Sequence, residues 1–399
     1  MGIKILLHPD RFYDFQSGSV ASRTAVKILT EMGYEVGVYT NDNYVKQDFN
    51  FKPFQRLPYT SKANLFSKKY ESNFVNVLNK FKPDYMFFIG GMIHTPVVYL
   101  KKAREMGIKT VFLFLVQDLY CARLHAAFGN SSCTKCLNQS NFNSIKNNCL
   151  EKGRSKYLYF LSYQINQKLF LKEFKKLHLV LGSTNEQLGF YKKLGISSER
   201  IKKIPLFFDP NRIKNKVNGN KDYFVYIAQN RVEKGPHLLT KILKELNKEI
   251  KIKALFLSDS AQRNFLINNP SVQKYVSTGQ LDLLSNVTMT NGAVEVIANS
   301  RGVLNLSIWA TTTEFVFLEI LGLKKPMICF DVGVHSETIK NRFNGCIVKP
   351  GNFRKFASEV EFLYSNPVES IKIGNEGYKL YLSLTSKKMF KNKFKEIFI

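Results

Sequence analysis

A strand, a helix that ends at glycine and a second strand follow one another repeatedly in this chain, and this pattern constrains the fold most. IKILLH has the composition of a buried strand, GSVASRTAVKILTEMG has apolar residues at helical spacing up to Gly33, and YEVGVYT is typical of the next strand. The same order returns in DYMFFIGG, TPVVYLKKAREMG and KTVFLFLVQD, where Gly107 ends the helix. Strands joined through a helix pair in parallel, so the pattern predicts a doubly wound α/β sheet.

The pattern restarts in the second half, with DYFVYIAQ, GPHLLTKILKELNKE, IKALFLSD, RGVLNLS and PMICFDVG. A chain of 399 residues suits two domains of ordinary size. We predict Rossmann-like domains at 1–205 and 206–375, and a carboxyl-terminal helix and tail at 376–399 that packs back on the first domain. Two such domains facing each other would form a cleft at the carboxyl ends of their strands, where these folds bind ligands.

The charge of the chain is strongly positive, with 59 Lys and Arg against 31 Asp and Glu and a formal net charge of +28. Such a charge attracts nucleic acid, anionic lipid headgroups or phosphorylated small molecules. The chain is also rich in Asn, Ile and Phe, as AT-rich coding sequences produce, so the charge alone selects no partner. Because the first apolar run is too short for a leader and no stretch could cross a membrane, we expect a cytoplasmic protein, soluble or peripheral on the inner membrane face.

Two strand-to-helix loops carry residue types that bind phosphate. In FQSGSVASR, Gly18 permits close backbone approach and Ser19 lies at a helix start whose N–H groups attract anions, although this stretch alone favours a simple connecting loop. In YIAQNRVEKGPHLL, Arg231 and Lys234 follow a strand and precede a Gly-Pro helix start. Arginine offers phosphate a planar fork and lysine a point charge, so this loop predicts diphosphate binding, with solvated cations as the alternative.

The stretch TTTEFVFLEILGLKKP contains two glutamates in a predicted helix that Thr312 or Thr313 would cap. Glu314 and Glu319 are five residues apart. At about 100° per residue they are roughly 500° apart and do not share a helical face. We therefore do not expect a catalytic pair of carboxylates here.

Several segments together resemble the family 4, group 1 glycosyltransferases. YIAQNRVEKG, EFVFLEILGLKKPMICFDVGVHSETI and FNGCIVKPGN are similar to the carboxyl-terminal half of that family. ILLHPD, SGSVASRTAVKILTEMGYEVGVYT and LGSTNEQLGFYKKLGISSERIKKIPLFFD are similar to its amino-terminal elements, so the likeness covers nearly the whole chain. The order and spacing of the carboxyl-terminal motif match at Glu319, Pro326, Asp331, Gly333, Glu337 and Gly345.

This resemblance implies a GT-B fold whose first domain binds the acceptor and whose second binds a UDP- or GDP-linked sugar. It also implies transfer with retention of the anomeric configuration and no catalytic metal. It assigns Glu319 to the nucleotide ribose and, with Asp118, to the catalytic centre. Arg231 and Lys234 would stabilise the charge that grows on the leaving diphosphate.

The chain differs from the family pattern at several positions. Thr311 stands where the first motif glutamate is expected, Glu314 replaces a glycine, and a Gln-Asp pair beginning at Gln117 replaces His-Asp. We interpret these differences as a variant donor site or sugar specificity, with loss of activity as the alternative. Thr311 and Glu314 are therefore counted among the donor-site candidates, together with Gly18 and Ser19.

Four of the six cysteines, Cys121, Cys133, Cys136 and Cys149, fall in a loop-like segment that we predict to be an insertion at 119–150. Cys133 and Cys136 form a C-x2-C pair, a spacing suited to tetrahedral zinc. The segment has no evident core pattern, so a structural zinc could order it. Free thiols in a loop are the alternative.

The segment RSKYLYFLSYQINQKLFLKEFKKLHL, near 154–177, predicts a long helix that is both basic and aromatic. Such a helix could lie at an anionic lipid surface. It could also pack on the core and expose a basic outer face, which is the interpretation we favour.

The sequence thus predicts an enzyme that moves a sugar from a nucleotide sugar to a glycan or lipid-linked glycan, as in surface polysaccharide or lipopolysaccharide biosynthesis. An anionic membrane surface is a further expected partner, and nucleic acid is not. Two alternatives stay open. A nucleic-acid-binding protein with a zinc knuckle would explain the charge and the C-x2-C pair but not two α/β domains. A GT-B epimerase would act on a nucleotide sugar without an acceptor.

Overall fold

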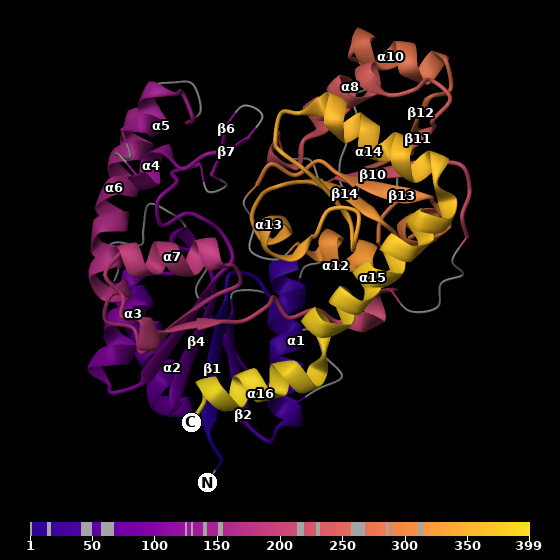
Figure 1. Cartoon of the computed structure of the whole chain (residues 1–399). Coiled ribbons are helices and arrows are strands. Elements are labelled where there is room, and N and C mark those ends of the chain that lie inside the picture. Colours follow the sequence, from indigo (N-terminus) through magenta and orange to yellow (C-terminus); the bar gives the residue numbers. More distant parts are fainter. Residues whose placement is uncertain are drawn as a thin grey trace. The chain divides into compact units, whose positions relative to one another are not determined.

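The computed structural model describes most of the chain (Figure 1). The contacts between residues divide the chain into two compact units. The described residues are 2–13, 17–40, 50–56, 68–123, 126–128, 131–138, 142–150, 155–213, 219–228, 232–256, 268–284, 287–289, 291–309 and 314–399. Unit 1 comprises Met1–Ala126, Thr134–Asp209 and Thr385–Ile399, and unit 2 comprises Ala127–Cys133 and Pro210–Leu384. Apart from the short stretch Ala127–Cys133, unit 2 begins at Pro210 and ends at Leu384, whereas we expected its boundaries after residues 205 and 375.

Unit 1 contains a sheet of seven strands in the order β3-β2-β1-β4-β5-β8-β9, all paired in parallel. The first six follow the 3-2-1-4-5-6 order of a doubly wound sheet, which changes direction between β1 and β4. The strands are β1 (Lys4–Pro9), β2 (Glu35–Thr40), β3 (Lys52–Gln55), β4 (Tyr85–Gly90), β5 (Lys109–Phe114), β8 (Leu179–Gly182) and β9 (Ile201–Lys203).

Helices cover both faces of this sheet, which explains why β4 is buried at every position. Met86 and Phe88 of β4 belong to a core that includes side chains of α2, α3 and α6. Phe87, which points to the other face, contacts the rings of Phe394 and Phe398 near the chain end. The helices are α1 (Ser17–Glu31), α2 (Lys68–Phe81), α3 (Val97–Glu105), α4 (Lys135–Asn138), α5 (Asn143–Lys146), α6 (Ser155–Phe174), α7 (Asn185–Lys193) and α16 (Lys387–Ile397), with 3-10 turns η1 (Met92–His94) and η2 (Ser198–Arg200).

The last helix, α16, returns to unit 1 and packs beside α1 (Figure 1). The Phe394 ring centroid lies 5.0 Å from that of Phe207. The Tyr34 hydroxyl donates to the Phe398 carbonyl oxygen over 3.3 Å. Burial of Phe390, Phe394 and Phe398 thus holds the end of the chain on the first sheet.

Unit 2 repeats the architecture with six parallel strands in the order β12-β11-β10-β13-β14-β15, again the 3-2-1-4-5-6 order. Its strands are β10 (Phe224–Ala228), β11 (Ile252–Phe256), β12 (Leu281–Leu284), β13 (Gly302–Asn305), β14 (Met327–Phe330) and β15 (Cys346–Val348). Both predicted doubly wound domains are therefore confirmed.

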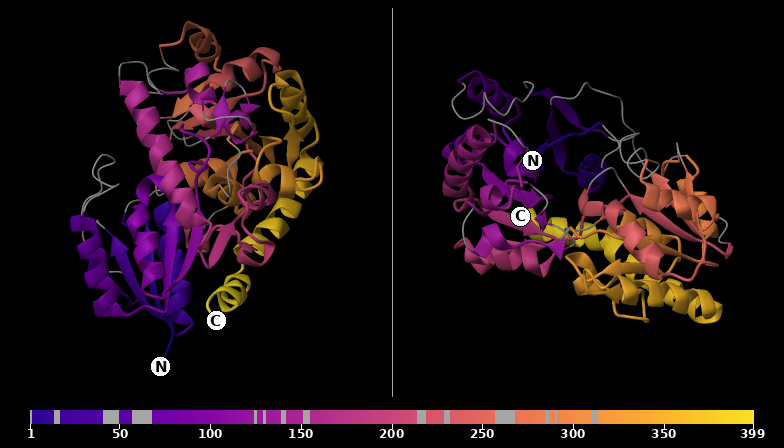
Figure 2. Two further views of the ribbon diagram at one scale, coloured as in Figure 1. Left: turned by 90° about the vertical axis from the view of Figure 1, so that its left-hand side faces the viewer. Right: turned by 90° about the horizontal axis from the view of Figure 1, so that it is seen from above.

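The helices of unit 2 lie on either side of its sheet, as the two views of Figure 2 show. They are α8 (Pro236–Glu245), α10 (Pro270–Ser277), α11 (Ala293–Asn299), α12 (Phe315–Gly322), α13 (Val334–Thr338), α14 (Phe353–Ser365) and α15 (Pro367–Thr385), with turns η3 (Pro210–Ile213) and η4 (Val232–Lys234). A two-stranded antiparallel hairpin, β6 (Ala127–Phe128) and β7 (Ser131–Ser132), lies in the cysteine-bearing segment. No helix in the described part of the chain has both the length and the hydropathy needed to span a membrane.

Candidate active site

Functional side chains are expected where each sheet changes direction. In unit 2, β10 lies between β11 and β13, and in unit 1, β1 lies between β2 and β4. The loops that leave such neighbouring strands run to opposite faces of the sheet, and ligands bind between them. These positions are the carboxyl ends of β10, β13 and β14 in unit 2 and of β1, β4 and β5 in unit 1.

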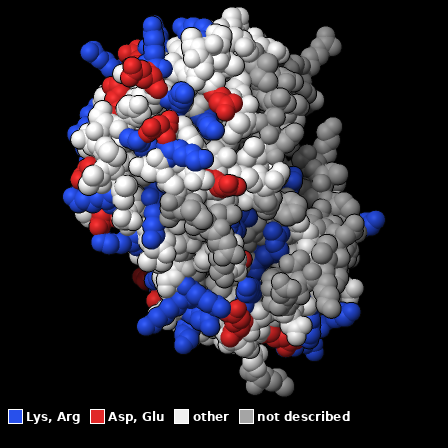
Figure 3. Space-filling view, turned by 90° about the vertical axis from the view of Figure 1, so that its right-hand side faces the viewer, with Lys and Arg blue, Asp and Glu red and all other residues white. Residues whose placement is uncertain are grey.

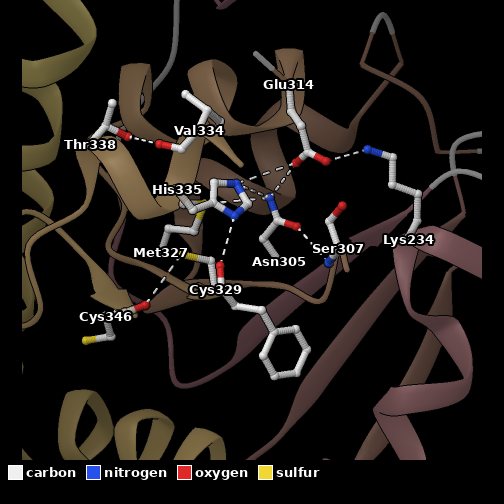
Figure 4. A network of polar contacts seen from close by, with 11 residues as sticks. Lys234, Asn305, Ser307, Glu314, Met327, Cys329, Val334, His335, Thr338 and Cys346 are labelled. Carbon is white, nitrogen blue, oxygen red and sulfur yellow. Dashed lines mark hydrogen bonds and ion pairs between the residues drawn. The ribbon is translucent and has the colours of Figure 1, made fainter. Parts of the chain in front are cut away.

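An ion pair between Lys234 and Glu314 lies at the centre of this region in unit 2 (Figure 4). Lys234 ends η4, the turn after β10, and Glu314 is the N-cap residue of α12. The side chain of Lys234 keeps 15% of its surface exposed and that of Glu314 only 4%, so the cation faces solvent and the anion faces the interior. The ring of Trp309 lies 4.9 Å from Lys234 Nζ and adds a cation–π contact.

Asn305 and His335 surround the other carboxylate oxygen of Glu314. Asn305, the last residue of β13, donates from Nδ2 to Glu314 Oε2 over 2.8 Å. His335 Nδ1 lies 3.2 Å from the Phe330 carbonyl oxygen, which can only accept, so Nδ1 carries the proton and Nε2 faces Glu314 unprotonated. Burial lowers the pKa of His335, in agreement with a neutral ring. Burial alone would raise the pKa of Glu314, but Lys234 and the other partners lower it to about 2.

Gly235 allows the turn that carries Lys234 to approach β13. Its φ is +75°, in the left-handed region that favours glycine. A Cβ atom on this residue would lie 2.1 Å from the Leu306 carbonyl oxygen, which is too close for any side chain. Glycine at this position therefore brings Lys234 within reach of Glu314.

A second buried ion pair joins Arg212 of η3 to Glu319 of α12. Arg212 donates from Nε over 3.0 Å and from Nη2 over 2.9 Å, both to Glu319 Oε1. Glu319 is 1% exposed, and burial raises its pKa although Arg212 opposes the shift. Its other oxygen, Oε2, accepts no hydrogen bond from a side chain in the described residues. The two glutamates of α12 thus have separate cationic partners, as their helical spacing predicts.

Two aspartates occupy the corresponding region of unit 1. Asp10 follows β1 and accepts a hydrogen bond from the Gly91 N–H over 3.1 Å. Asp118 follows β5 and accepts one at Oδ2 from the Ile93 N–H over 2.9 Å. A Cβ on Gly91 would lie 2.5 Å from Asp118 Oδ2, so glycine makes room for the carboxyl group. Asp118 is fully buried, and its Oδ1 has no hydrogen-bond partner among the described residues.

Burial raises the pKa of Asp10 to about 7 and that of Asp118 to about 8, and the nearby Asp10 adds to the shift of Asp118. Asp118 is therefore mostly protonated at neutral pH, a state in which a carboxyl group can donate a hydrogen bond. Arg56 Nη1 lies 3.0 Å from His8 Nε2, and Arg56 also donates to the Asp10 carbonyl oxygen over 3.3 Å. Burial, and then Arg56, lower the pKa of His8. This region of unit 1 thus places the Arg56 guanidinium near two carboxyl groups, Asp10 and Asp118, whose pKa values are raised.

The structure does not show the zinc site that the cysteine spacing predicts. Among the residues that the structure describes, which include all four of these cysteines, no three His, Cys, Asp or Glu side chains are grouped so that they could hold a metal ion. Cys133 follows the β6–β7 hairpin, Cys136 lies in α4 and Cys149 follows α5. The structure therefore gives no support to a zinc ligand set made of these four cysteines.

Comparison with known proteins identifies the second half of the chain. Residues 207–380 match the family model described as glycosyl transferases group 1. These residues form a group 1 glycosyltransferase domain. No curated protein has a sequence that matches the chain.

Solved structures place the whole chain in the GT-B fold. HepE from Anabaena in complex with UDP has a TM-score of 0.70 at 12% identity, with 99% of both chains covered. Sucrose-phosphate synthase from Thermosynechococcus elongatus has a TM-score of 0.74 at 12% identity, covering 99% of this chain and 98% of its own. WaaG, a glycosyltransferase involved in lipopolysaccharide biosynthesis, has a TM-score of 0.63 at 13% identity, with 99% of both chains covered.

The residues predicted from the sequence of this glycosyltransferase are distributed over both units. Lys234 and Glu314 contact each other, whereas Arg231 and Thr311 lie outside the described residues. Gly18 and Ser19 lie in the first turn of α1, where the buried Ser19 hydroxyl has no hydrogen-bond partner in the described part of the chain. The predicted threonine cap of α12 is wrong: the N-cap residue is Glu314, whose carboxylate is directed to Lys234 instead of the helix N–H groups.

Several polar residues of the candidate site were not predicted from the sequence. The sequence did not single out Asn305, Arg212, Asp10 or Arg56. Asn305 ends β13 and Asp10 directly follows β1, and this position at the end of a strand was the available signal. No local pattern marks Arg212 or Arg56 as a partner of buried groups, because their contacts lie far away in the chain.

Replacing Arg212 with methionine in the glycosyltransferase is expected to lower the free energy of unfolding at pH 7 by about 3–5 kcal/mol, because Glu319 would stay buried without a cation. The pKa of Glu319 in the folded state would then rise further above its value in the unfolded state. Protonation of Glu319 therefore stabilises the folded variant at low pH, and this contribution is lost as the pH rises. The loss of stability caused by Arg212→Met should be larger at pH 7 than at pH 5. Urea denaturation at both pH values measures this.

The double variant R212M/E319Q, which buries no charge, should regain most of the loss. Lys101→Met, at an exposed pair with Glu105, should change stability by no more than about 1 kcal/mol. An equal defect of R212M at pH 5 and pH 7 would show that lost packing, and not the charge of Glu319, is responsible.

Proposed function

We propose that the chain transfers a sugar from a UDP- or GDP-linked donor to a glycan or lipid-linked glycan, with retention of the anomeric configuration and without a catalytic metal. The observation that carries this proposal is the Lys234–Glu314 pair at the β10/β13 switch point of a group 1 glycosyltransferase domain. The buried carboxylate holds the ammonium group, whose exposed side remains available to an anion. A diphosphate approaching from solvent would meet Lys234 first.

The leaving group of such a transfer is a nucleoside diphosphate, and its charge grows as the glycosidic bond breaks. A cation already positioned in a partly buried site stabilises that charge without having to move. Lys234 would provide this, together with Arg231 and the candidates Gly18, Ser19 and Thr311 that the sequence indicates. Glu314 holds the ammonium group of Lys234 in place in the free enzyme.

Glu319 is the proposed acceptor of hydrogen bonds from the donor ribose. Arg212 contacts Oε1 alone, so Oε2 can accept hydroxyl hydrogens. Asp118 is the proposed catalytic group of unit 1, because its raised pKa keeps a proton on a buried carboxyl group at neutral pH. In this state Asp118 would donate a hydrogen bond to a substrate oxygen.

Two of the similar structures support the choice of substrates. HepE from Anabaena is also known in complex with UDP-glucose, and WaaG is involved in lipopolysaccharide biosynthesis. We extend these substrates to this chain as part of the proposal. A lipid-linked acceptor would place the enzyme at the cytoplasmic face of a membrane, in agreement with the excess of basic residues over the whole sequence.

Nucleotide sugars are expected to raise the melting temperature of the protein. A donor present at 100 times its dissociation constant stabilises the folded state by about 2.7 kcal/mol, which corresponds to several degrees for a domain of this size. A thermal-shift series with UDP-, GDP-, ADP- and CMP-linked sugars measures this, and we expect a UDP- or GDP-linked sugar to give the largest shift. Uridine and guanosine, which lack the diphosphate, are the matched controls.

A shift as large with the nucleosides as with the nucleotide sugars would contradict the role of Lys234. Absence of any shift would contradict the donor proposal as a whole. Incubation of the bound donor without acceptor separates transfer from the epimerase alternative, since an epimerase would convert the sugar without releasing the nucleotide.

A further inference from the structure

Helix α6 has large apolar side chains on two opposite faces. Phe160, Tyr163, Phe170 and Phe174 are buried against unit 1, where Phe170 and Phe174 contact the rings of β5. On the other side, four aliphatic residues are exposed: Leu158 by 71%, Leu161 by 56%, Ile165 by 51% and Leu169 by 37%. The predicted core-packed helix is therefore present, but its outer face is not simply basic.

The four exposed residues form one continuous stripe. At about 100° per residue they fall within an arc of roughly 80°, which is centred opposite the buried face. Eleven residues separate the first from the last, so the stripe extends over about 16 Å at 1.5 Å per residue. The left view of Figure 2 has this side of unit 1 toward the reader. We define Leu158, Leu161, Ile165 and Leu169 as the α6 stripe.

Further exposed rings lie near the start of the stripe. Phe142, which immediately precedes α5, is 67% exposed, and its ring centroid lies 5.2 Å from that of Phe160. Tyr157, next to Leu158, is 53% exposed. A surface that is both apolar and aromatic at this end is suited to insertion among lipid headgroups, where rings of this kind collect.

The charges on α6 decide which partner the stripe fits. Lys168 is exposed beside it, Lys172 is exposed about one turn beyond Leu169 in line with the stripe, and Lys175 follows the end of the helix. The single acidic residue of α6, Glu173, is 8% exposed and bonded to Arg104 and Lys176. The outer face of α6 thus carries only positive charge. By contrast, basic and acidic side chains are interspersed on the face of the molecule seen in Figure 3.

We propose that α6 docks unit 1 onto an anionic lipid surface, with the α6 stripe inserted at the headgroup level and Lys168 and Lys172 at the phosphates. A helix with an apolar face and flanking lysines binds such a surface in two ways: the apolar side chains are buried among the lipids, and the lysines are attracted to the anionic headgroups. A second copy of the chain fits less well, because the lysines of two stripes would face one another and repel. The docking surface goes beyond the proposed transfer reaction and includes none of its residues.

Vesicle co-sedimentation of the full chain, without donor or acceptor, tests this proposal. We expect binding to vesicles of phosphatidylcholine with one quarter phosphatidylglycerol, and much weaker binding to phosphatidylcholine alone. The variant L158Q/L161Q/I165Q should lower the partition coefficient by at least about tenfold. These side chains are exposed, so the circular dichroism spectrum and melting temperature should not change.

The chain offers a matched control in α15, where Val368, Ile371 and Leu382 are exposed by 81%, 51% and 50%. The variant V368Q/I371Q/L382Q should bind vesicles as the wild type does. K168Q/K172Q should lower binding roughly tenfold and reduce its dependence on salt, whereas K244Q/K248Q, at exposed lysines of unit 2, should not.

Three results would overturn the proposal. These are equal binding of the wild type to both kinds of vesicle, no binding at all, and unchanged binding of the α6 variants. Size-exclusion chromatography provides a further test, since a dimer that L158Q/L161Q/I165Q converts to a monomer would show that the stripe binds a second copy. The vesicle experiment contains no nucleotide sugar, so its outcome is independent of the thermal-shift result. Either proposal can therefore fail without affecting the other.

Discussion

Replacement of Lys234 with methionine is expected to abolish sugar transfer and to lower the free energy of unfolding by about 3–5 kcal/mol. The stability loss follows because Glu314, 6% exposed, would keep its charge with only Asn305 and a neutral His335 beside it. The activity loss, at least about 100-fold in turnover, follows from the missing cation at the leaving diphosphate. Urea denaturation and nucleotide release from the donor measure the two effects.

The double variant K234M/E314Q separates the structural from the catalytic contribution of Lys234. Glutamine cannot ionise but can still accept the hydrogen bond from Asn305, so the double variant should regain most of the stability and none of the activity. Lys379→Met, at an exposed pair with Glu376, is the matched control and should change neither. Near-normal transfer by K234M/E314Q would mean that Lys234 serves only to neutralise Glu314.

Asp118→Asn is expected to make the protein more stable at pH 8 and to have little effect at pH 4. The folded-state pKa of Asp118, about 8, lies above the value of 3.8 of an exposed aspartate. Its contribution to stability is therefore complete below about pH 4 and is lost as the pH rises toward 8, by up to about 1.4 kcal/mol per pH unit. Asparagine can keep the hydrogen bond from Ile93 and carries no charge, so the gain at pH 8 should reach up to about 5 kcal/mol.

Neighbouring groups require that Asp118→Asn be compared with the wild type at every pH. Burial lowers the pKa of His8 and brings that of His94 to about 4, so both contribute stability above pH 6.5 that is lost as the pH falls. Below pH 6.5 the stability lost at the two histidines opposes the stability gained at the aspartates. The histidine contribution is the same in the wild type and in Asp118→Asn, so it cancels when the two free energies of unfolding are subtracted. Asp10→Asn is the companion variant, and its gain should be smaller because Asp10 is partly exposed.

Urea denaturation from pH 4 to 8 gives this difference directly. A constant difference across the range would contradict a raised pKa at Asp118. The same ionisation has a functional consequence under the proposed mechanism: transfer by the wild type should decline above pH 8, as Asp118 loses the proton that it would donate to substrate.

Much of the secondary structure could be predicted from local patterns. The helix predicted in GSVASRTAVKILTEMG is α1 over Ser17–Glu31, and the helix predicted near 154–177 is α6 over Ser155–Phe174. The repetition of strand, helix and glycine predicted two parallel sheets, because a chain that alternates strands and helices has few other ways to bury them. The N-cap of α12 was mispredicted, since Glu314 has a stronger partner in Lys234 than in the helix N–H groups.

The site could be predicted only in part. Lys234 was identified because a cation in a loop between a strand and a Gly-Pro helix start has a local signature. Its partner Glu314 lies 80 residues away and was taken for a departure from a family glycine. Asp118 was identified through the family resemblance, whereas Asp10, which raises its pKa, has no motif around it.

By itself, the sequence of this protein determined which segments are strands and helices, that they form two doubly wound sheets, and which loop carries the candidate lysine. Hydrophobic periodicity and glycine placement are local properties, and they depend on neighbours a few residues away. Only the tertiary structure decided that Lys234 meets Glu314, that Arg212 meets Glu319, and that one face of α6 stays exposed. Charge pairing and burial depend on which strands become neighbours, and the 3-2-1-4-5-6 strand order brings together residues that the chain holds far apart.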